Sequence, residues 1–185
     1  MSDLKIQKAR RSSSHLLKSG ERVVFRTLEM SDKENLLAFL NNLSVETKSK
    51  FGLSIWEYID SPEMLHMVLV NQAGKIIGCI ILSFGLRDSQ VVRYKDYGIS
   101  LEQGCDMCIA PVVADLYQNK GVGTIMLGES IRIAKSLGVK HIILWQGTQV
   151  TNTNAIYFYE KFGFKKNGEF QKYGNYNVDM TLTLQ

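Results

Sequence analysis

The segment that most constrains the fold of this chain runs from residue 105 to residue 146, where a strand, a helix and another strand are expected in succession. An apolar run over 105–113 has the length of a buried strand, and 122–137 shows apolar residues at helical spacing. A further apolar run follows over 141–146. Because two strands joined through a helix lie parallel in one sheet, a purely antiparallel architecture is excluded.

The remaining elements are mostly strands joined by turns. Two apolar runs, 65–71 and 75–84, flank a turn that contains Gly74, which indicates a hairpin. Ser31 and Glu34 form a capping-box pattern that opens a helix. The other expected elements are strands over 23–29, 164–170 and 178–184, and helices ending near 43, over 44–51 and over 154–162. The order predicts an α+β fold with a mixed, mostly antiparallel sheet of six to seven strands flanked by helices.

Positive charge is concentrated at the start of the chain. Residues 1–22 carry six Lys or Arg and two Asp or Glu, whereas the remaining 163 residues carry sixteen of each. We therefore expect a solvated basic tail over 1–22 and a single domain over 23–185. A transit peptide or a nucleic-acid-binding arm is the weaker interpretation of the tail. Because the body is neutral, no nucleic-acid partner is predicted.

Apolar patterning and cysteine usage predict a cytoplasmic protein with no membrane segment and no metal. No apolar run reaches the roughly 18 residues that a membrane-spanning helix needs, and the N-terminal segment shows no apolar core of a secretory signal. An odd count of three cysteines fits a reducing compartment. Cys105 and Cys108 are expected on a strand, where residues three apart face opposite sides, so they do not form a metal-binding pair.

A glycine-containing loop, QNKGVGT over 118–124, precedes the central helix. Unpaired N–H groups at a helix start attract anions, glycine lets a ligand approach the backbone, and Lys120 adds positive charge. The nucleotide-binding P-loop is excluded because its lysine follows the glycines. The dinucleotide pattern is excluded because Met126 occupies the position of its third glycine. The loop matches a third pattern, Gln/Arg-x-x-Gly-x-Gly/Ala, with a simple tight turn as the alternative.

A second motif lies about 35 residues further along the chain, which reads NTNAIYFYEKFGF over 152–164. The spacing N-x-x-A-x-x-x-Y-x-x-x-G-F is matched by Asn152, Ala155, Tyr159, Gly163 and Phe164. With both motifs present in this order, the sequence resembles the GCN5-related N-acetyltransferase (GNAT) superfamily. The resemblance covers roughly 23–184, and 104–165 carries nearly all of its specificity.

The resemblance implies acetyl-coenzyme A as co-substrate, with its pyrophosphate on the glycine loop. Val112 and Val113 are expected beside the pantetheine arm. Asn152 is expected to bond this arm, with helix capping as the alternative. The family often has glycine where this chain has Asn119, a residue that tolerates left-handed backbone. The loop residues expected to bind the cofactor are Gln118, Asn119, Lys120, Gly121, Val122, Gly123 and Thr124.

The same resemblance implies direct attack of an amine on the thioester, without a covalent enzyme intermediate. Tyr159 is expected beside the sulfur as general acid, because a phenol with an ordinary pKa of about 10 is protonated at neutral pH. The general base stays open. Asp106 lies on the strand that often supplies it, and Glu102 lies just before that strand. His66 is a weaker candidate, and deprotonation through water is the remaining alternative.

The predicted activity is transfer of an acetyl group to a primary amine through a tetrahedral intermediate. A small-molecule acceptor is favoured because the body is neutral and the long 86–103 connection is typical of a lid. A protein N-terminus or lysine is the alternative acceptor, and a non-catalytic acyl-CoA-binding module is the alternative function. The acceptor site is expected from the early helices, 86–103 and the loop before the last strand, with Tyr173 and Tyr176. A homodimer is a further expectation.

Overall fold

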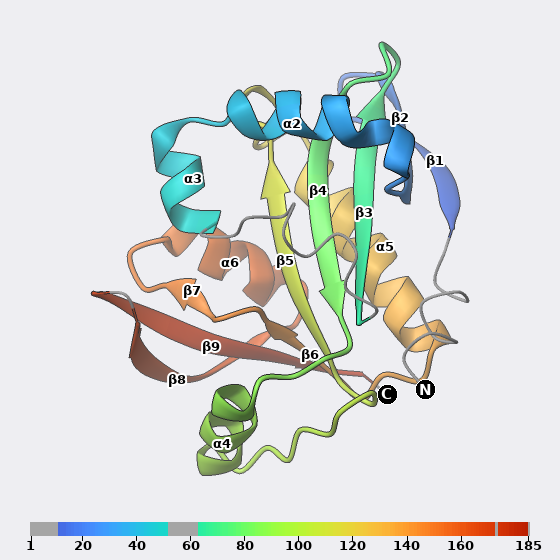
Figure 1. Ribbon diagram of the computed structural model, residues 1–185. Helices are drawn as coiled ribbons and strands as arrows, with labels where there is room; N and C mark the ends of the chain where they lie inside the picture. Colours follow the sequence, from blue (N-terminus) through green and yellow to red (C-terminus); the bar gives the residue numbers. More distant parts are fainter. Residues whose placement is uncertain (1–10, 52–62, 173, 185) are drawn as a thin grey trace. The chain divides into compact units, whose positions relative to one another are not determined.

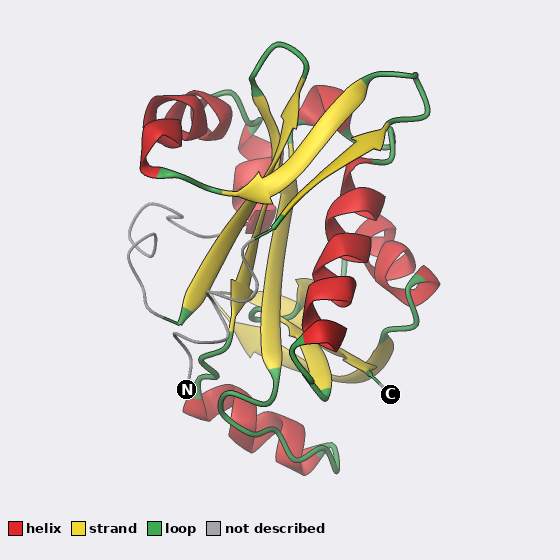
Figure 2. Ribbon diagram, turned by 90° about the vertical axis from the view of Figure 1, so that its right-hand side faces the viewer, coloured by secondary structure: helices red, strands yellow, loops and turns green. Residues whose placement is uncertain are grey.

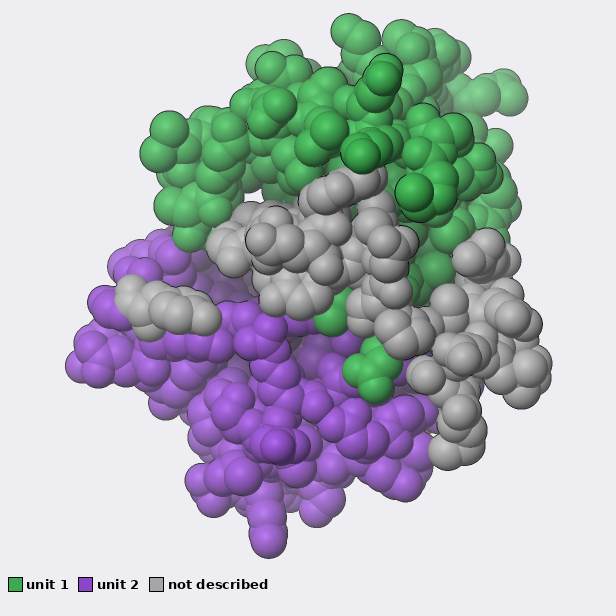
Figure 3. All heavy atoms as spheres, viewed as in Figure 1, with its two compact units in different colours: residues 1–82, 110–133 green, residues 83–109, 134–185 purple. Residues whose placement is uncertain are grey.

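The structure is a computed structural model that describes residues 11–51, 63–172 and 174–184. Figure 1 follows the chain in colour from its N-terminus, and Figure 2 separates helices, strands and loops. The chain divides into two compact units, coloured in Figure 3. Unit 1 comprises Met1–Leu82 and Ala110–Ile133, and unit 2 comprises Ser83–Ile109 and Ala134–Gln185. The single domain expected over 23–185 stays a prediction.

Unit 1 is built on a sheet in which successive strands along the chain are also neighbours. Its strands are β1 (Ser12–Leu16), β2 (Arg22–Thr27), β3 (Met64–Asn71), β4 (Ile76–Ser83) and the second half of β5 (Met107–Val113). β2 pairs antiparallel with both β1 and β3. The N–H of Asn71 donates to the carbonyl of Lys75 at 2.9 Å where β3 turns into β4, so the predicted hairpin is confirmed.

β1 corrects the expectation of a solvated tail over 1–22. Each residue of β1 pairs with β2, from Ser12 opposite Arg26 to Leu16 opposite Arg22. The tail prediction was therefore wrong for this strand, and residues 1–10 lie outside the described residues. The run SSSHL has no apolar alternation and no fully buried residue. Backbone pairing to β2 holds this strand in place. Its own sequence has no periodicity from which the strand could be predicted.

The helices described in unit 1 are η1 (Met30–Asp32), α2 (Lys33–Asn41), α3 (Val45–Phe51), η3 (Asp115–Tyr117) and most of α5 (Val122–Ser136). α2 and α5 cover opposite faces of β3 and β4 (Figure 1, Figure 2). The expected capping box of Ser31 and Glu34 is replaced by Asp32, whose Oδ2 accepts from the N–H of Glu29 at 2.9 Å. Arg26 binds the same carboxylate at 2.6 and 2.7 Å, which fixes Asp32 at the helix start.

Gly78 lies where β4 meets α5. A methyl group on Gly78 would lie 2.8 Å from Sδ of Met126 and 3.0 Å from Cγ1 of Val122. We expect Gly78→Ala to destabilise the fold by about 1–3 kcal/mol, the usual cost of overpacking. Gly128 lies inside α5 with open space around it, so Gly128→Ala is expected to add up to about 1 kcal/mol of stability. Urea unfolding checks both variants, and shifts of the same sign would contradict the close approach at Gly78.

Unit 2 contains the parallel strand pair that the sequence predicts. Its strands are the first half of β5, β6 (His141–Leu144), β7 (Thr148–Gln149), β8 (Lys165–Lys172) and β9 (Asn175–Thr183). β5 and β6 run parallel, whereas β9 pairs antiparallel with β6, β7 and β8. The mixed, mostly antiparallel sheet is therefore confirmed. Nine strands are described in the two units instead of six to seven, because β1 and β7 were not predicted.

The long connection over 86–103 contains a helix, α4 (Asp88–Asp96). Tyr94 on this helix is fully buried, and its cluster is formed with Leu86, Leu101, Cys108 and Ile143. No helix was predicted within this connection, so α4 corrects the expected order of elements. A second helix of unit 2, α6 (Thr153–Lys161), agrees with the predicted 154–162. None of the helices in the described ranges is long and apolar enough to cross a membrane.

Candidate active site

The predicted anion-binding loop connects η3 to the start of α5 in unit 1. Asn119 and Gly121 both have left-handed backbone, with φ of 59° and 92°. The N–H of Ile125 donates to the carbonyl of Gly121 at 3.0 Å, which is an α-helical bond at the start of α5. The first-turn N–H groups, which have no acceptor inside an α-helix, are those of Val122, Gly123 and Thr124. N–H groups in this position attract negative charge, so the local geometry is compatible with the predicted anion site.

β5 ends in the two residues predicted to flank the pantetheine arm. Val112 is buried and Val113 is half-buried, and adjacent residues of a strand point to opposite faces of the sheet. The N–H of the next residue, Ala114, donates to the carbonyl of Ile77 at 2.9 Å and fixes where the chain leaves the sheet. Lys120 lies in the loop with its Nζ 5.6 Å from the ring centre of Tyr117.

A polar cluster joins the loop to the start of α3. Asp115 Oδ1 accepts from Thr47 Oγ1 at 2.6 Å and from Ser44 Oγ at 2.8 Å. Asp115 Oδ2 accepts from the N–H of Ser44 at 2.8 Å. Gln118 Nε2 donates to Thr47 Oγ1 at 3.2 Å, so this side chain is engaged with α3. The hydrogen bond from Thr47, followed by that from the Ser44 backbone, lowers the pKa of Asp115.

Sequence reasoning did not find this cluster. A short helix was expected over 44–51, and at its start the N–H of Thr47 donates to Ser44 Oγ at 3.1 Å. The partner Asp115 is 71 positions away from Ser44, and no local pattern links the two segments. The available signal was a capping serine followed by Thr47. This pattern indicates where the helix starts, but it does not indicate that Asp115 binds there.

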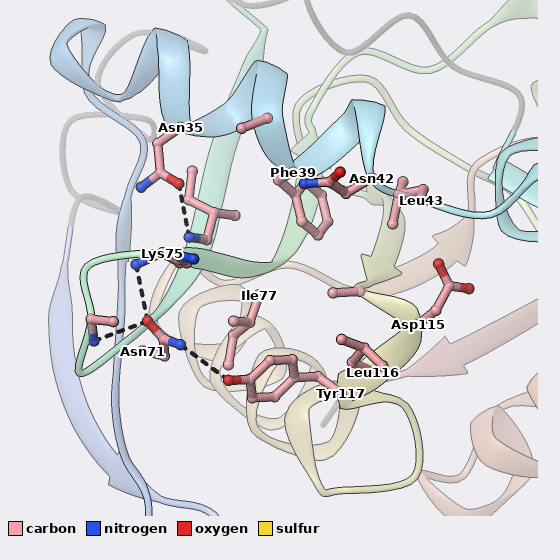
Figure 4. A pocket seen from close by; sticks show the side chains of 14 residues that line it. Asn35, Phe39, Asn42, Leu43, Asn71, Lys75, Ile77, Asp115, Leu116 and Tyr117 are labelled. Atoms are coloured by element: carbon pink, nitrogen blue, oxygen red, sulfur yellow. Dashed lines mark hydrogen bonds between the residues drawn. The ribbon is translucent and has the colours of Figure 1, made fainter.

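A cavity of about 530 Å³ lies in unit 1 beside η3 (Figure 4). Phe39 from α2 and Ile77 from β4 contribute to its apolar wall. Asn71 forms a polar side, because its Oδ1 accepts from two N–H groups of the β3–β4 turn and its Nδ2 donates to the Tyr117 hydroxyl at 3.0 Å. Tyr117, which lines the cavity, is followed directly along the chain by Gln118 of the predicted anion-binding loop.

Unit 2 holds the residues of the second motif on α6. Asn152 Oδ1 accepts from the N–H of Ala155 at 3.3 Å, so Asn152 caps the helix. Tyr159 is 7% exposed, and its ring centre lies 5.4 Å from those of Phe158 and Phe164. Burial raises the pKa of the Tyr159 hydroxyl, which keeps it protonated at neutral pH. Tyr157 on the same helix is 59% exposed.

The two candidate bases of unit 2 lie together, and Asp106 is tied to the backbone. Its Oδ2 accepts from the N–H of Glu102 at 2.7 Å. Its Oδ1 accepts from the N–H of His141 at 2.8 Å and lies 2.9 Å from Nδ1 of the same residue. Asp106 is 0% exposed, so these bonds favour a structural role that anchors β6. Glu102 carries an exposed ion pair with Lys140 at 3.2 Å.

The weaker candidate base, His66, is a buried residue of β3 in unit 1. It is 4% exposed, and its Nε2 has no hydrogen-bond partner among the residues that the structure describes. Burial lowers the pKa of His66 to about 4. The imidazole is therefore neutral and weakly basic at neutral pH, which favours packing over proton transfer.

The predicted site residues thus fall into two groups. The cofactor-binding residues from Val112 to Thr124 belong to unit 1, whereas Glu102, Asp106, Asn152 and Tyr159 belong to unit 2. Of the acceptor residues, Tyr176 is exposed on β9, and Tyr173 lies outside the described residues.

Comparison with known proteins places this arrangement in a family. The model of the acetyltransferase (GNAT) family matches residues 33–164, well over half of the chain. The protein YdhI of Bacillus subtilis (strain 168), described as uncharacterized, is 32% identical over 96 residues, which are 52% of this chain and 47% of YdhI. The chain therefore spans about half the length of the curated relative it matches.

Two solved structures show how far the fold agrees. The GNAT domain of S. lividans PAT has a TM-score of 0.74 at 18% identity, covering 94% of this chain and 97% of that one. The aminoglycoside acetyltransferase AAC(6')-Ib, solved in complex with coenzyme A, has a TM-score of 0.64 at 17% identity, covering 87% and 94%. The resemblance to the superfamily and the predicted fold are thus confirmed, and this chain belongs to the acetyltransferase (GNAT) family.

Proposed function

We propose that the protein transfers an acetyl group from acetyl-coenzyme A to a primary amine of a small molecule. The observation that carries the proposal is the loop geometry, in which left-handed Asn119 and Gly121 lead into the first-turn N–H groups of α5. Such N–H groups bind phosphate oxygens. A complex of a structurally similar acetyltransferase with coenzyme A supports a coenzyme A pyrophosphate as the anion.

The remaining cofactor contacts are assigned from the ends of elements. The last residues of β5, Val112 and Val113, are proposed to run beside the pantetheine arm. Because Asn152 uses its Oδ1 to cap α6, its Nδ2 is the group that can donate to this arm. Gln118 supports the loop through Thr47 instead of binding phosphate with its side chain.

The proposed chemistry is direct acyl transfer. The amine nitrogen bonds to the thioester carbonyl carbon, and the resulting tetrahedral intermediate expels coenzyme A as a thiolate. The carbon–sulfur bond breaks with its electron pair on sulfur, which takes the proton of the buried Tyr159 hydroxyl, and the Tyr159 phenolate then regains a proton from water. The ammonium proton leaves to water, because both carboxylate oxygens of Asp106 are engaged. Exposed Glu102 is the alternative base.

Two matched glycine variants test the proposed pyrophosphate site. Gly121 and Gly20 both have left-handed backbone and open space at their Cα, but only Gly121 lies in the loop. Alanine at either position costs about 1–2 kcal/mol of backbone strain. Gly121→Ala is expected to weaken acetyl-coenzyme A binding by about 10-fold or more, because a backbone shift costing about 1.4 kcal/mol has that effect. Gly20→Ala should bind like the wild type.

Calorimetric titration with acetyl-coenzyme A, and with ATP and NAD as comparison ligands, measures these affinities. Binding of ATP or NAD in place of acetyl-coenzyme A would refute the proposal. If wild type and Gly121→Ala bound acetyl-coenzyme A equally well, this loop would not be the pyrophosphate site.

A small-molecule acceptor is preferred to a protein because a structurally similar family member is named for aminoglycosides. A thiol-release assay with small amines and with peptides separates the two acceptor classes. Acetyl-coenzyme A binding without thiol release for any amine would favour the non-catalytic module. A cytoplasmic location and a homodimer stay predictions.

A further inference from the structure

α4 is fixed to the last strand of unit 2 by a buried ion pair. Arg93 Nε donates to Asp179 Oδ2 at 2.7 Å, and Arg93 Nη2 donates to Oδ1 at 3.1 Å. Asp179 is 0% exposed. The hydroxyl of Tyr94 donates to the carbonyl of Met180 at 3.1 Å. The 86–103 connection and the β8–β9 hairpin, two segments from which an acceptor site was expected, are therefore held together.

Cationic and aromatic side chains gather where these segments meet. The Arg93 guanidinium carbon lies 3.8 Å from the ring centre of Phe170 on β8. Lys172 lies two residues beyond Phe170 on the same strand, so both side chains share one face. The Arg87 guanidinium carbon, just before α4, lies 5.5 Å from the ring centre of Trp145. Burial, followed by repulsion from Arg87 and Arg93, lowers the pKa of Lys172.

The two arginines of this cluster differ in how their charge is compensated. Asp179 binds Arg93 with both oxygens. Arg87 has no acidic partner within the part of the chain that the structure describes, and it is half-buried against Trp145. A guanidinium that is partly withdrawn from water and held over an aromatic ring binds carboxylates well, because its planar fork donates two parallel hydrogen bonds.

We propose that Arg87, Trp145, Phe170 and Lys172 form an anion-binding shelf that holds the carboxylate of the acceptor. The acceptor is therefore an amine that also carries a negative group, with an amino acid as the simplest case. This inference rests on the proposed function, which supplies the acyl transfer. Polycationic amines are disfavoured, because like charges at the shelf repel them.

A binding experiment tests the shelf without turnover. The chain has two tryptophans, so Trp56→Phe leaves Trp145 as the reporter of fluorescence. The titrants are N-acetyl amino acids and the matching N-acetyl amino acid amides, which differ in the carboxylate, with inorganic phosphate as a second anion. We expect saturable quenching by the acids, at least about 10-fold tighter than by the amides, a difference of about 1.4 kcal/mol. Tighter binding of phosphate would identify a phosphorylated acceptor instead.

Two arginine variants in the Trp56→Phe background make the test specific. Arg87→Gln is expected to remove the difference between acid and amide. Arg132→Gln is the matched control, because Arg132 is an exposed arginine of α5 paired with Glu129 in unit 1. Equal binding of acid and amide, or no saturable response to any acid, would overturn the shelf.

Turnover then separates the failure of this inference from that of the proposed function. Thiol release is measured with amino acids, amino acid amides and spermidine at saturating acetyl-coenzyme A. We expect a higher kcat/KM for amino acids than for the amides and spermidine. In Arg87→Gln, a higher KM for amino acids should remove this difference. Acetylation of spermidine and amides in preference to amino acids would overturn the shelf and leave the acetyltransferase proposal intact. If the protein did not bind acetyl-coenzyme A, the proposed function would be refuted. The fluorescence result on carboxylate binding would still hold.

Discussion

Replacing Tyr159 with phenylalanine is expected to lower kcat by about 100-fold or more, the usual contribution of a positioned general acid. The sulfur leaves more readily when a proton is transferred to it as the carbon–sulfur bond breaks, and the phenol of Tyr159 is the proposed donor. Phenylalanine keeps the ring contacts with Phe158 and Phe164, so stability and the Kd for acetyl-coenzyme A should change little. Steady-state kinetics and calorimetry on the same variant measure the two quantities.

The control for this variant is Tyr157→Phe on the same helix. Tyr157 is 59% exposed, and Lys161 Nζ lies 4.3 Å from its ring centre. Removal of its hydroxyl should leave kcat unchanged. If Tyr159→Phe also kept its kcat, the leaving thiolate would be protonated by solvent, and Tyr159 would be a core residue.

The pH dependence of kcat provides a second readout for Tyr159. Burial raises the pKa of its hydroxyl above the ordinary value of about 10. A group that acts in its protonated form and has a raised pKa stays active as pH rises. We therefore expect no loss of kcat from this group below about pH 10, so any alkaline limb at lower pH belongs to another residue.

The parts of the fold that were predictable from sequence are those with strong periodicity or a local signature. The strands β3, β4, β5 and β6 were predicted from their apolar runs. The loop before α5 and the start of α6 were predicted from the two motifs. The β3–β4 hairpin followed from a turn glycine between apolar runs. In each case, the residues that determine the structure lie within a few positions of one another.

The missed elements depend on partners that are distant in sequence. β1 is a serine-rich run with no buried face, and it exists because β2 offers backbone partners. α4 was not predicted because its sequence is polar. The helix is held in place by Arg93, whose partner Asp179 lies 86 positions away in the sequence. The same holds at the candidate site, where His141 engages Asp106 across 35 positions. Asp106, which lies just before β5 in the structure, was predicted as a base because its structural partner could not be seen in the sequence.

The ion pair between Arg93 and Asp179 carries the largest expected effect on stability. Arg93→Met should destabilise the protein by about 3 kcal/mol or more, because it leaves the carboxylate of Asp179 buried without its charged partner. The Tyr97 hydroxyl lies 3.4 Å from Asp179 Oδ2 and offers only a long, neutral hydrogen bond in compensation. Urea unfolding with a constant m-value measures the change in the free energy of unfolding.

Two further variants separate this cost from a general effect of losing a surface charge. Lys166→Met removes an exposed ion pair with Glu160, 3.3 Å long, from the same unit, and such pairs contribute less than about 1 kcal/mol. The double variant Arg93→Met with Asp179→Leu removes both charges and should recover much of the stability lost by Arg93→Met alone, since a buried charge is then no longer unpaired. If the double variant were less stable than Arg93→Met, docking of α4 would depend on the ion pair itself. The anion-binding shelf would then lose Arg87 together with the helix that positions it.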